Sequence, residues 1–190
     1  MRAWWKKEPL DKKESALLEL VMKAHYQSAF RANTSSVLVA SCADSSGDIS
    51  KSLCAAVMSM GGKHAPLEAT IHFLSYKDPC QLVPMILKEG QKIPGWGGTF
   101  QKGQPDPLWH EVDLFLWEHF GDMATKIADV TDELDRHLKE RIHPNPSAYT
   151  AASAILVGMK AKLVPYLFIA SRLDAWAQIA SGHIYPEGSD

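Results

Sequence analysis

Residues 92–107 read "KIPGWGGTFQKGQPDP" and contain four glycines within twelve positions. Glycine destabilises a helix by about 1 kcal/mol relative to alanine, so the stretch predicts a turn rather than a helix. Such a turn tolerates backbone conformations and close approaches that a Cβ atom would prevent. Asp106-Pro107 at its end is typical of the start of a new helix. We therefore expect a glycine-rich connection between two helices.

The composition is that of one ordinary globular domain, or of one domain with a small annex. The 190 residues carry a formal net charge of −2, and 22% of them are charged. This balance lacks the basic field that nucleic acid binding needs, and no apolar run of about 18 residues is present. The sequence therefore predicts no nucleic acid partner and no membrane span, and it has no pattern of a secretory leader.

The three cysteines, Cys42, Cys54 and Cys80, do not form the C-x-x-C pairs of zinc or redox sites. We interpret them as reduced, small apolar residues of a cytoplasmic protein. The histidines also lack the usual spacing of metal ligands. No metal site is expected.

Apolar residues recur with helical spacing along most of the chain. In residues 14–30 they stand at i, i+3, i+4 and i+7, which is the pattern of an amphipathic helix. Residues 34–44 are apolar enough for either a strand or a buried helix. Further helical runs, bounded by proline or glycine, are 48–62, 65–75, 78–90, 106–141, 148–159 and 165–180. We expect an all-α fold of seven or eight helices, with a bend or split at Pro84 and a break near Gly121.

Three segments carry a recognisable combination of motifs: "GGKHAPLEAT" at 61–70, "LKEGQKIPGWGGTFQKGQPDP" at 87–107, and "ELDRHLKERIHPNPSAYTAASAIL" at 133–156. In this order, and followed by the helix of 164–180, they resemble the C-terminal half of the citrate synthase and citryl-CoA lyase family. The second segment is similar to the family's I-P-G-F-G-H-R-V-Y-K run, and the third to its N-V-D-F-Y-S turn.

This resemblance implies a citrate synthase-like helical fold with a truncated large domain and a small domain. We expect residues 14–75 and 146–182 to form a partial large-domain core and residues 76–145 a small-domain-like helical region. Residues 1–13 would be an N-terminal arm whose Trp4-Trp5 pair docks on this chain or on a partner. The family also implies a homodimer, with residues 48–60 in an antiparallel interface.

The family's reaction needs a base, usually aspartate, that takes the α proton of a CoA thioester, and two histidines that stabilise the enol and polarise the ketone. The resemblance places His64 at the enol-stabilising histidine and Arg172 at a carboxylate-binding arginine. Gly98, however, stands at the ketone-polarising histidine, and Ser147 at the base. Two plainer interpretations stay open: His64 caps the preceding helix, and Arg172 forms a structural ion pair with Asp174 or with a neighbouring helix.

The same resemblance assigns coenzyme A, or an acyl-CoA as substrate, to the glycine-rich turn. Gly95 and Gly97 would let the backbone approach the adenine, and Lys102 would contact a CoA phosphate. Trp96 would either stack on the adenine or pack between domains.

The substitutions at Gly98 and Ser147 favour a citrate synthase-like pseudoenzyme, which keeps a pocket for a CoA thioester and a carboxylate but has lost or altered its Claisen condensation or cleavage. A second hypothesis is an active acyl-CoA condensing enzyme or citryl-CoA lyase completed by a partner chain. A third is a helical scaffold or interaction protein.

Away from the site, residues 132–141 predict a solvated charged helix face. Met22, Met58 and Met60 are expected to fill the core.

Overall fold

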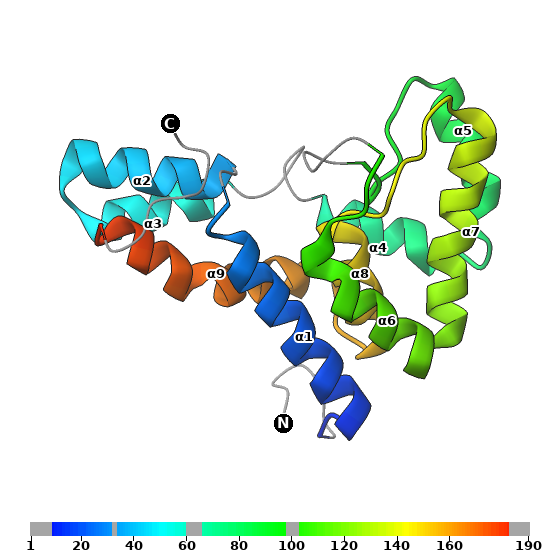
Figure 1. Cartoon of the computed structure of the whole chain (residues 1–190), viewed down its shortest axis with the longest axis horizontal. Helices are drawn as coiled ribbons and strands as arrows, with labels where there is room; N and C mark the ends of the chain where they lie inside the picture. The colour runs from blue at the N-terminus through cyan, green and yellow to red at the C-terminus, as the bar shows by residue number, and fades with distance from the viewer. Residues whose placement is uncertain (1–8, 32–33, 60–65, 98–102, 183–190) are drawn as a thin grey trace. The chain divides into compact units, whose positions relative to one another are not determined.

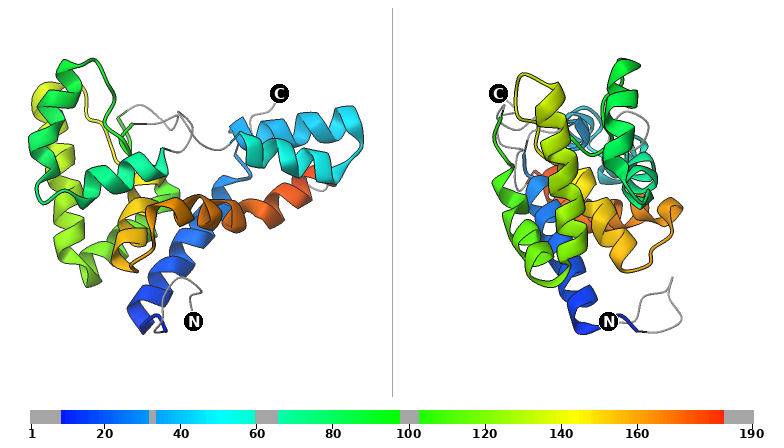
Figure 2. Two further views of the ribbon diagram at one scale, coloured as in Figure 1. Left: turned by 180° about the vertical axis from the view of Figure 1, so that it is seen from behind. Right: turned by 90° about the vertical axis from the view of Figure 1, so that its right-hand side faces the viewer.

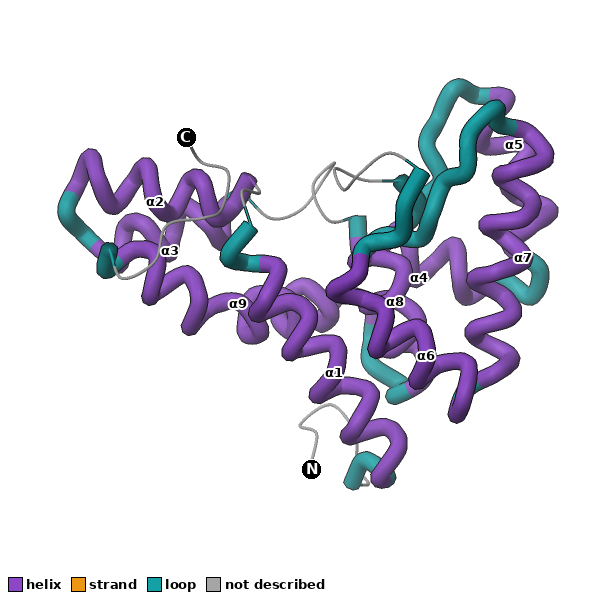
Figure 3. Tube along the Cα trace, viewed as in Figure 1, coloured by secondary structure: helices purple, strands orange, loops and turns teal. Residues whose placement is uncertain are grey.

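The protein is helical throughout the residues that its structure, a computed structural model, describes: 9–31, 34–59, 66–97 and 103–182. Figure 3 shows helices joined by loops in these ranges, and an isolated antiparallel bridge joins Trp96 and Pro144. The all-α prediction is confirmed. The α-helices of these ranges are α1 (Lys12–Ser28), α2 (Thr34–Ser46), α3 (Ile49–Met58), α4 (Leu67–Ser75), α5 (Val83–Lys88), α6 (His110–His119), α7 (Gly121–His137), α8 (Pro146–Leu156) and α9 (Val164–Ala180). Three short 3₁₀ helices accompany them: η1 (Pro79–Leu82), η2 (Pro107–Trp109) and η3 (Ala161–Leu163).

The helices begin and end close to the predicted positions. The ambiguous run 34–44 lies in helix α2. Pro84 splits its run as expected, because a proline is tolerated only in the first turn of a helix: η1 ends at Leu82 and α5 begins at Val83. The long run predicted from Asp106 is divided at Phe120, between α6 and α7.

The chain divides into two compact units. The first unit comprises Met1–Val21 and Pro66–Val164, and the second comprises Met22–Ala65 and Pro165–Asp190. These boundaries differ from the predicted ranges, because α4 and α8 belong to the same unit as α5, α6 and α7. The assignment of ranges to the family's large and small domains stays a prediction. Residues 1–8 of the predicted arm, with Trp4-Trp5, lie outside the described residues.

The second unit is built from the end of α1, the hairpin of α2 and α3, and helix α9. Helices α2 and α3 run side by side in opposite directions, as the front and back views show (Figures 1 and 2). Side chains from all four helices form the core; its buried members are Ala29, Val39, Ala56, Ala175, Trp176 and Ile179. Full burial of a valine or isoleucine side chain contributes roughly 1.5 to 3 kcal/mol, so these helices stabilise one another through this shared core.

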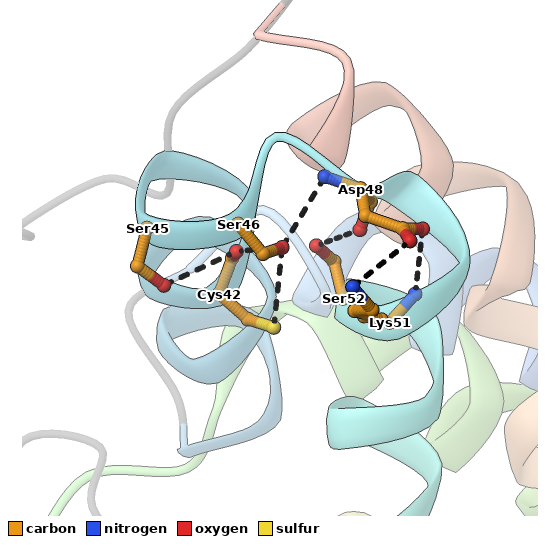
Figure 4. A network of polar contacts seen from close by, with 6 residues as sticks. All are labelled: Cys42, Ser45, Ser46, Asp48, Lys51 and Ser52. Atoms are coloured by element: carbon orange, nitrogen blue, oxygen red, sulfur yellow. Dashed lines mark hydrogen bonds and ion pairs between the residues drawn. The ribbon is translucent and has the colours of Figure 1, made fainter.

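A set of side-chain hydrogen bonds closes the turn between α2 and α3 (Figure 4). Asp48 is the N-cap of α3, where its Oδ1 accepts from the backbone N–H of Lys51 at 3.1 Å. Ser52 Oγ donates to the carbonyl of Asp48 at 2.8 Å, and the N–H of Asp48 donates to Ser46 Oγ at 3.2 Å. The predicted helix start at Asp48 is confirmed, since an N-cap carboxylate satisfies donors that the helix itself leaves unpaired.

Several large apolar side chains of the α2–α3 hairpin are exposed: Val37, Leu38, Ile49, Val57 and Met58. Met58 is 85% exposed, so the expectation that it fills the core is wrong; Met60 lies outside the described residues. Helix α3 is only ten residues long, and Ala56 faces the core while Met58, two positions later, points away from it.

Helix α8 is buried along most of its length, and every residue from Ser147 to Ala154 is buried. Most of these residues are alanine, serine or threonine, so helix α4 can pack closely against it. The hydroxyls of Thr150 and Ser153 donate to carbonyls one turn earlier, at 2.7 and 2.8 Å. These bonds satisfy buried polar groups within the helix itself.

Candidate functional site

The glycine-rich turn pairs with the chain that enters helix α8. The backbone N–H of Gly97 donates to the carbonyl of His143 at 3.0 Å, and the N–H of Asn145 donates to the carbonyl of Gly95 at 2.9 Å. These two bonds flank the bridge between Trp96 and Pro144. The structure thus joins two of the three motifs that carry the family resemblance, although they are almost fifty residues apart.

Gly95 has a packing reason to be glycine. Its φ is +90°, and a Cβ atom added there would lie 2.6 Å from Thr70 Cγ2 and 3.3 Å from the Cα of Ala148. At Gly95 the turn therefore lies so close to helices α4 and α8 that a residue with a Cβ atom would collide with them. The sequence identified the close approach, and the structure identifies these two helices as what is approached. The CoA role assigned to Gly95 and Gly97 stays a prediction.

Trp96 lies inside the first unit and is only 5% exposed. Its indole Nε1 donates to Thr131 Oγ1 on α7 at 3.0 Å, and its ring meets the Phe73 ring of α4 edge-on, with 5.7 Å between centroids. Of the two interpretations of Trp96, this environment favours packing, within one unit. A tryptophan whose N–H is bonded and whose ring is enclosed anchors the turn to α4 and α7.

Asn145 fixes the start of α8 and the glycine-rich turn together. Its Oδ1 accepts from the N–H of Ser147 at 2.8 Å, which makes it the N-cap, and its Nδ2 donates to the carbonyl of Gly97. Pro146 follows at the first helical position, where its missing N–H costs nothing. Ser147, which the resemblance predicts to stand at the family's base position, is consequently held at the second position of α8 and is 7% exposed.

We expect Asn145→Ala to lower the free energy of unfolding by about 2 to 3 kcal/mol, because it removes an N-cap and a partly buried hydrogen bond to the turn. Asn145→Asp is the matched control: it keeps the capping oxygen and loses only the donor to Gly97. Urea unfolding followed by circular dichroism measures both changes. A loss for Asn145→Asp as large as that for Asn145→Ala would show that the cap contributes nothing.

A carboxyl group does lie beside α8, but not next to Ser147. The hydroxyl of Tyr149 donates to Asp113 Oδ1 of α6 at 3.3 Å, and the Tyr149 ring stacks on Trp109. Burial raises the pKa of Asp113, opposed by the Tyr149 hydrogen bond and His110, and burial with nearby Asp113 raises the pKa of Tyr149. Tyr149 is two positions after Ser147 and points about 200° away around the helix. Asp113 is therefore directed to a different side of α8 from Ser147.

His143 contacts both ends of the loop that follows Gly97. Its carbonyl accepts from the Gly97 N–H, and its ring Nε2 lies 3.2 Å from the carbonyl oxygen of Gly103. Sequence reasoning favoured a surface or interface role for His143 over metal ligation and did not predict these contacts, since they involve two residues forty or more positions away. Three predicted site residues, His64, Gly98 and Lys102, lie outside the described residues.

Arg172 is buried in the second unit, at 6% exposure. Its Nη2 donates to Ser28 Oγ of α1 at 2.7 Å, and its guanidinium carbon lies 4.2 Å from the centre of the Phe168 ring. The ion pair with Asp174 that sequence reasoning left open is not formed, and Asp174 instead accepts from Gln178 at 3.0 Å. Burial lowers the pKa of Arg172 to about 9, so the side chain remains a cation at neutral pH.

His25 completes the surroundings of Arg172. It is fully buried and meets the same Phe168 ring edge-on, at 4.5 Å between centroids. Burial, and secondly the nearby charge of Arg172, hold the pKa of His25 well below its usual range. The imidazole is therefore neutral. The sequence signal for His25 was its place on the apolar stripe of an amphipathic helix, which predicted its burial and not its neighbour.

The predicted site residues fall in different units. Gly95, Trp96, Gly97 and Ser147 belong to the first unit, whereas Arg172 belongs to the second. Among the described residues no group of three histidine, cysteine or acidic side chains could hold a metal ion. Each of the three cysteines is free of disulfide bonds. None of the helices in the described ranges has the length and apolar character to cross a membrane.

The charged run 132–141 is largely exposed, as its spacing predicted, but only residues 132–137 are helical, because α7 ends at His137. Glu133 pairs with Arg136 and with His137, and Arg141 lies 3.6 Å from Asp135. Exposed pairs of this kind contribute little to stability.

Comparison with known families shows to which family the chain belongs. The sequence model of the family described as "Citrate synthase, C-terminal domain" matches residues 1–181. The chain belongs to the citrate synthase family. No protein of curated function matches the sequence.

Solved structures of this family share the fold. Citryl-CoA lyase from Hydrogenobacter thermophilus superposes with a TM-score of 0.78 at 21% identity, over 98% of this chain and 76% of that chain. ATP citrate lyase from Methanosaeta concilii, solved with (3S)-citryl-CoA, has a TM-score of 0.77 at 16% identity, over 94% of this chain. Citrate synthase from Thermotoga maritima has a TM-score of 0.72 at 19% identity, over 90% of this chain. The chain spans 32% of that ATP citrate lyase and 49% of that citrate synthase.

Proposed function

We propose that this chain binds a CoA thioester and a carboxylate in a citrate synthase-like pocket, and that its Claisen condensation or cleavage is lost or altered. The observation that carries the proposal is Ser147 at the second position of α8, held there by its Asn145 cap, where the family places its aspartate base. An unactivated hydroxyl cannot take the α proton of a thioester. The carboxyl of Asp113 is directed to Tyr149, which points to another side of α8.

The proposed roles of the other residues follow the family positions. His64 would stabilise an enol, Lys102 would contact a CoA phosphate, and the backbone of Gly95–Gly97 would face the CoA. Arg172 would bind a substrate carboxylate, a task to which a planar guanidinium is suited. We assign Trp96 a packing role in this proposal, because its ring is enclosed by α4 and α7. The structures of ATP citrate lyase with (3S)-citryl-CoA, and with citrate and coenzyme A, support this class of ligand.

We further propose that the protein is a cytoplasmic homodimer joined through the α2–α3 hairpin. The exposed apolar side chains of this hairpin support an association surface: Val37, Leu38, Ile49, Val57 and Met58. The free cysteines fit a reducing compartment.

The activity test is restoration of the missing groups. We expect the purified chain to form citrate from acetyl-CoA and oxaloacetate, or to cleave citryl-CoA, at least about 10⁴-fold more slowly than an ordinary member, because two groups worth about 10² to 10⁴ each are absent. Ser147→Asp combined with Gly98→His should raise the rate by two or more orders of magnitude. Release of free CoA thiol measures citrate formation, and release of oxaloacetate measures citryl-CoA cleavage.

Ser147→Asn combined with Gly98→His is the matched control, because it reproduces the size of aspartate without the carboxylate. It should stay well below the rate of the variant that combines Ser147→Asp with Gly98→His, because the base is still absent. Citrate formation by the unmodified chain at ordinary enzyme rates would overturn the proposal.

A second candidate is an active enzyme completed by another chain or segment. It is favoured by the exposed hairpin surface and by the short span of this chain on the larger relatives. In that case a complex isolated under mild conditions would cleave citryl-CoA while the purified chain does not, and His64→Ala would abolish the activity of the complex. If neither CoA nor citrate binds and a stable complex still forms, the scaffold hypothesis replaces both.

A further inference from the structure

The guanidinium of Arg172 is held by a hydrogen-bonded relay that ends on helix α1. Its Nη2 donates to Ser28 Oγ at 2.7 Å, and Ser28 Oγ donates in turn to the carbonyl of His25 at 2.9 Å. A serine hydroxyl has a single proton. Because that proton is directed to His25, the oxygen presents a lone pair to Arg172. Both hydrogen bonds of Ser28 therefore have a defined direction: Arg172 donates to Ser28, and Ser28 donates to His25.

A second contact fixes the plane of the guanidinium. Phe168 precedes Arg172 by one helical turn on α9, so both side chains lie on the same face of the helix. The guanidinium carbon lies 4.2 Å from the centre of the Phe168 ring, and the edge of the His25 ring packs against that ring. All four side chains are buried, at 0 to 6% exposure. Arg172 thus has one edge held by Ser28 and one face covered by Phe168.

Burial of the Arg172 side chain alone does not require that both the edge and the plane of its guanidinium be fixed. An arginine has several rotatable bonds, and ordering it costs up to about 2 kcal/mol of side-chain entropy. A guanidinium that is already oriented avoids this cost when a ligand binds. Bidentate binding of a carboxylate also depends on the orientation of the planar fork.

We infer that Ser28 is a positioning residue that orients Arg172 for binding the carboxylates of the substrate. The inference rests on the proposed function, which makes Arg172 the carboxylate-binding arginine, and it adds a residue on a different helix to that site. Ser28 does not itself touch the substrate. The ligand class is a citrate-like tricarboxylate or a 2-oxo dicarboxylate.

The test is calorimetric titration of the full chain with citrate and, separately, with CoA. Ser28→Ala should weaken citrate binding by about 10- to 150-fold, which corresponds to the loss of one hydrogen bond to a charged group. CoA binding should not change, because CoA is assigned to the first unit. Ser28→Thr, which keeps the hydroxyl, should recover most of the citrate affinity. Arg172→Gln serves as the reference for complete loss of the carboxylate contact.

The ratio of citrate to CoA affinity separates positioning from a merely structural role. A structural role alone would lower the melting temperature of Ser28→Ala and leave this ratio as in the unmodified chain, which would overturn the inference while the proposed function stands. If the unmodified chain binds CoA but no citrate, the carboxylate half of the proposed function fails, and the inference falls with it. Should Arg172→Gln not fold, the comparison of Ser28→Ala with Ser28→Thr still decides.

Discussion

Replacing Gly95 with alanine is expected to destabilise the first unit by about 2 to 5 kcal/mol. Its φ of +90° is unfavourable for any residue with a Cβ atom, which costs roughly 1 to 2 kcal/mol. The added Cβ would also lie 2.6 Å from Thr70 Cγ2, with Ala148 at 3.3 Å, and overpacking of this kind costs about 1 to 3 kcal/mol. Urea unfolding followed by circular dichroism measures the sum.

Gly90→Ala is the matched control. Gly90 also has a positive φ, +70°, but a Cβ there would meet no atom within 4 Å. Gly90→Ala should therefore lower the free energy of unfolding only by the backbone contribution, about 1 to 2 kcal/mol. An equal loss at Gly90 and Gly95 would contradict the close approach of the turn to α4 and α8.

Thr70→Ser offers a further check, because it removes the Cγ2 methyl group and keeps the hydroxyl that donates to the carbonyl of Pro66 at 2.7 Å. In the Gly95→Ala background it should recover part of the lost stability, although the contact with Ala148 remains. The two substitutions should thus be strongly non-additive. If Gly95→Ala alone does not fold, recovery of the native circular dichroism spectrum in the double variant provides the readout.

Stability is expected to fall as the pH decreases below about 6.5, because His25 is held neutral in the folded protein. Its folded pKa lies well below the ordinary histidine value of about 6.5, mainly through burial and secondly through the charge of Arg172. Between the folded and unfolded pKa values, the unfolded chain binds a proton that the folded chain refuses. The free energy of unfolding then decreases with falling pH by up to about 1.4 kcal/mol per pH unit. Above about pH 7 this contribution is constant.

His25→Gln, which is neutral at every pH, isolates the effect from that of other groups. The difference in pH dependence between the unmodified chain and this variant should lie in the range below pH 6.5. In the folded protein, the imidazole resonances of His25 should not shift between pH 7 and pH 6. Titration of the folded His25 near its ordinary pKa would contradict its burial beside Arg172, even if the variant does not fold.

The sequence predicted much of the fold because local signals agree with the tertiary structure. Asp48 at the start of α3, Pro84 in the first turn of α5 and Pro146 after the Asn145 cap each act within one turn of chain, so their effect is visible from neighbouring residues. Residues 34–44 could not be assigned, because apolar residues lie on both sides of α2: Val39 is buried, whereas Val37 and Leu38 are exposed. Met58 was assigned wrongly for the same reason: hydrophobicity does not say which side of a helix meets the core.

For the candidate site, too, some properties follow from the local sequence and others only from the tertiary structure. The motifs by themselves determined the family resemblance. They also predicted the roles of His64 and Arg172 and the departures from the family motifs at Gly98 and Ser147, because residue type and spacing are properties of the chain. Only the tertiary structure decided what those residues touch: Gly95 approaches Thr70 and Ala148, Trp96 bonds to Thr131, and Arg172 bonds to Ser28 rather than Asp174. These contacts join residues from 25 to 144 positions apart, and no local pattern encodes the packing of one helix on another.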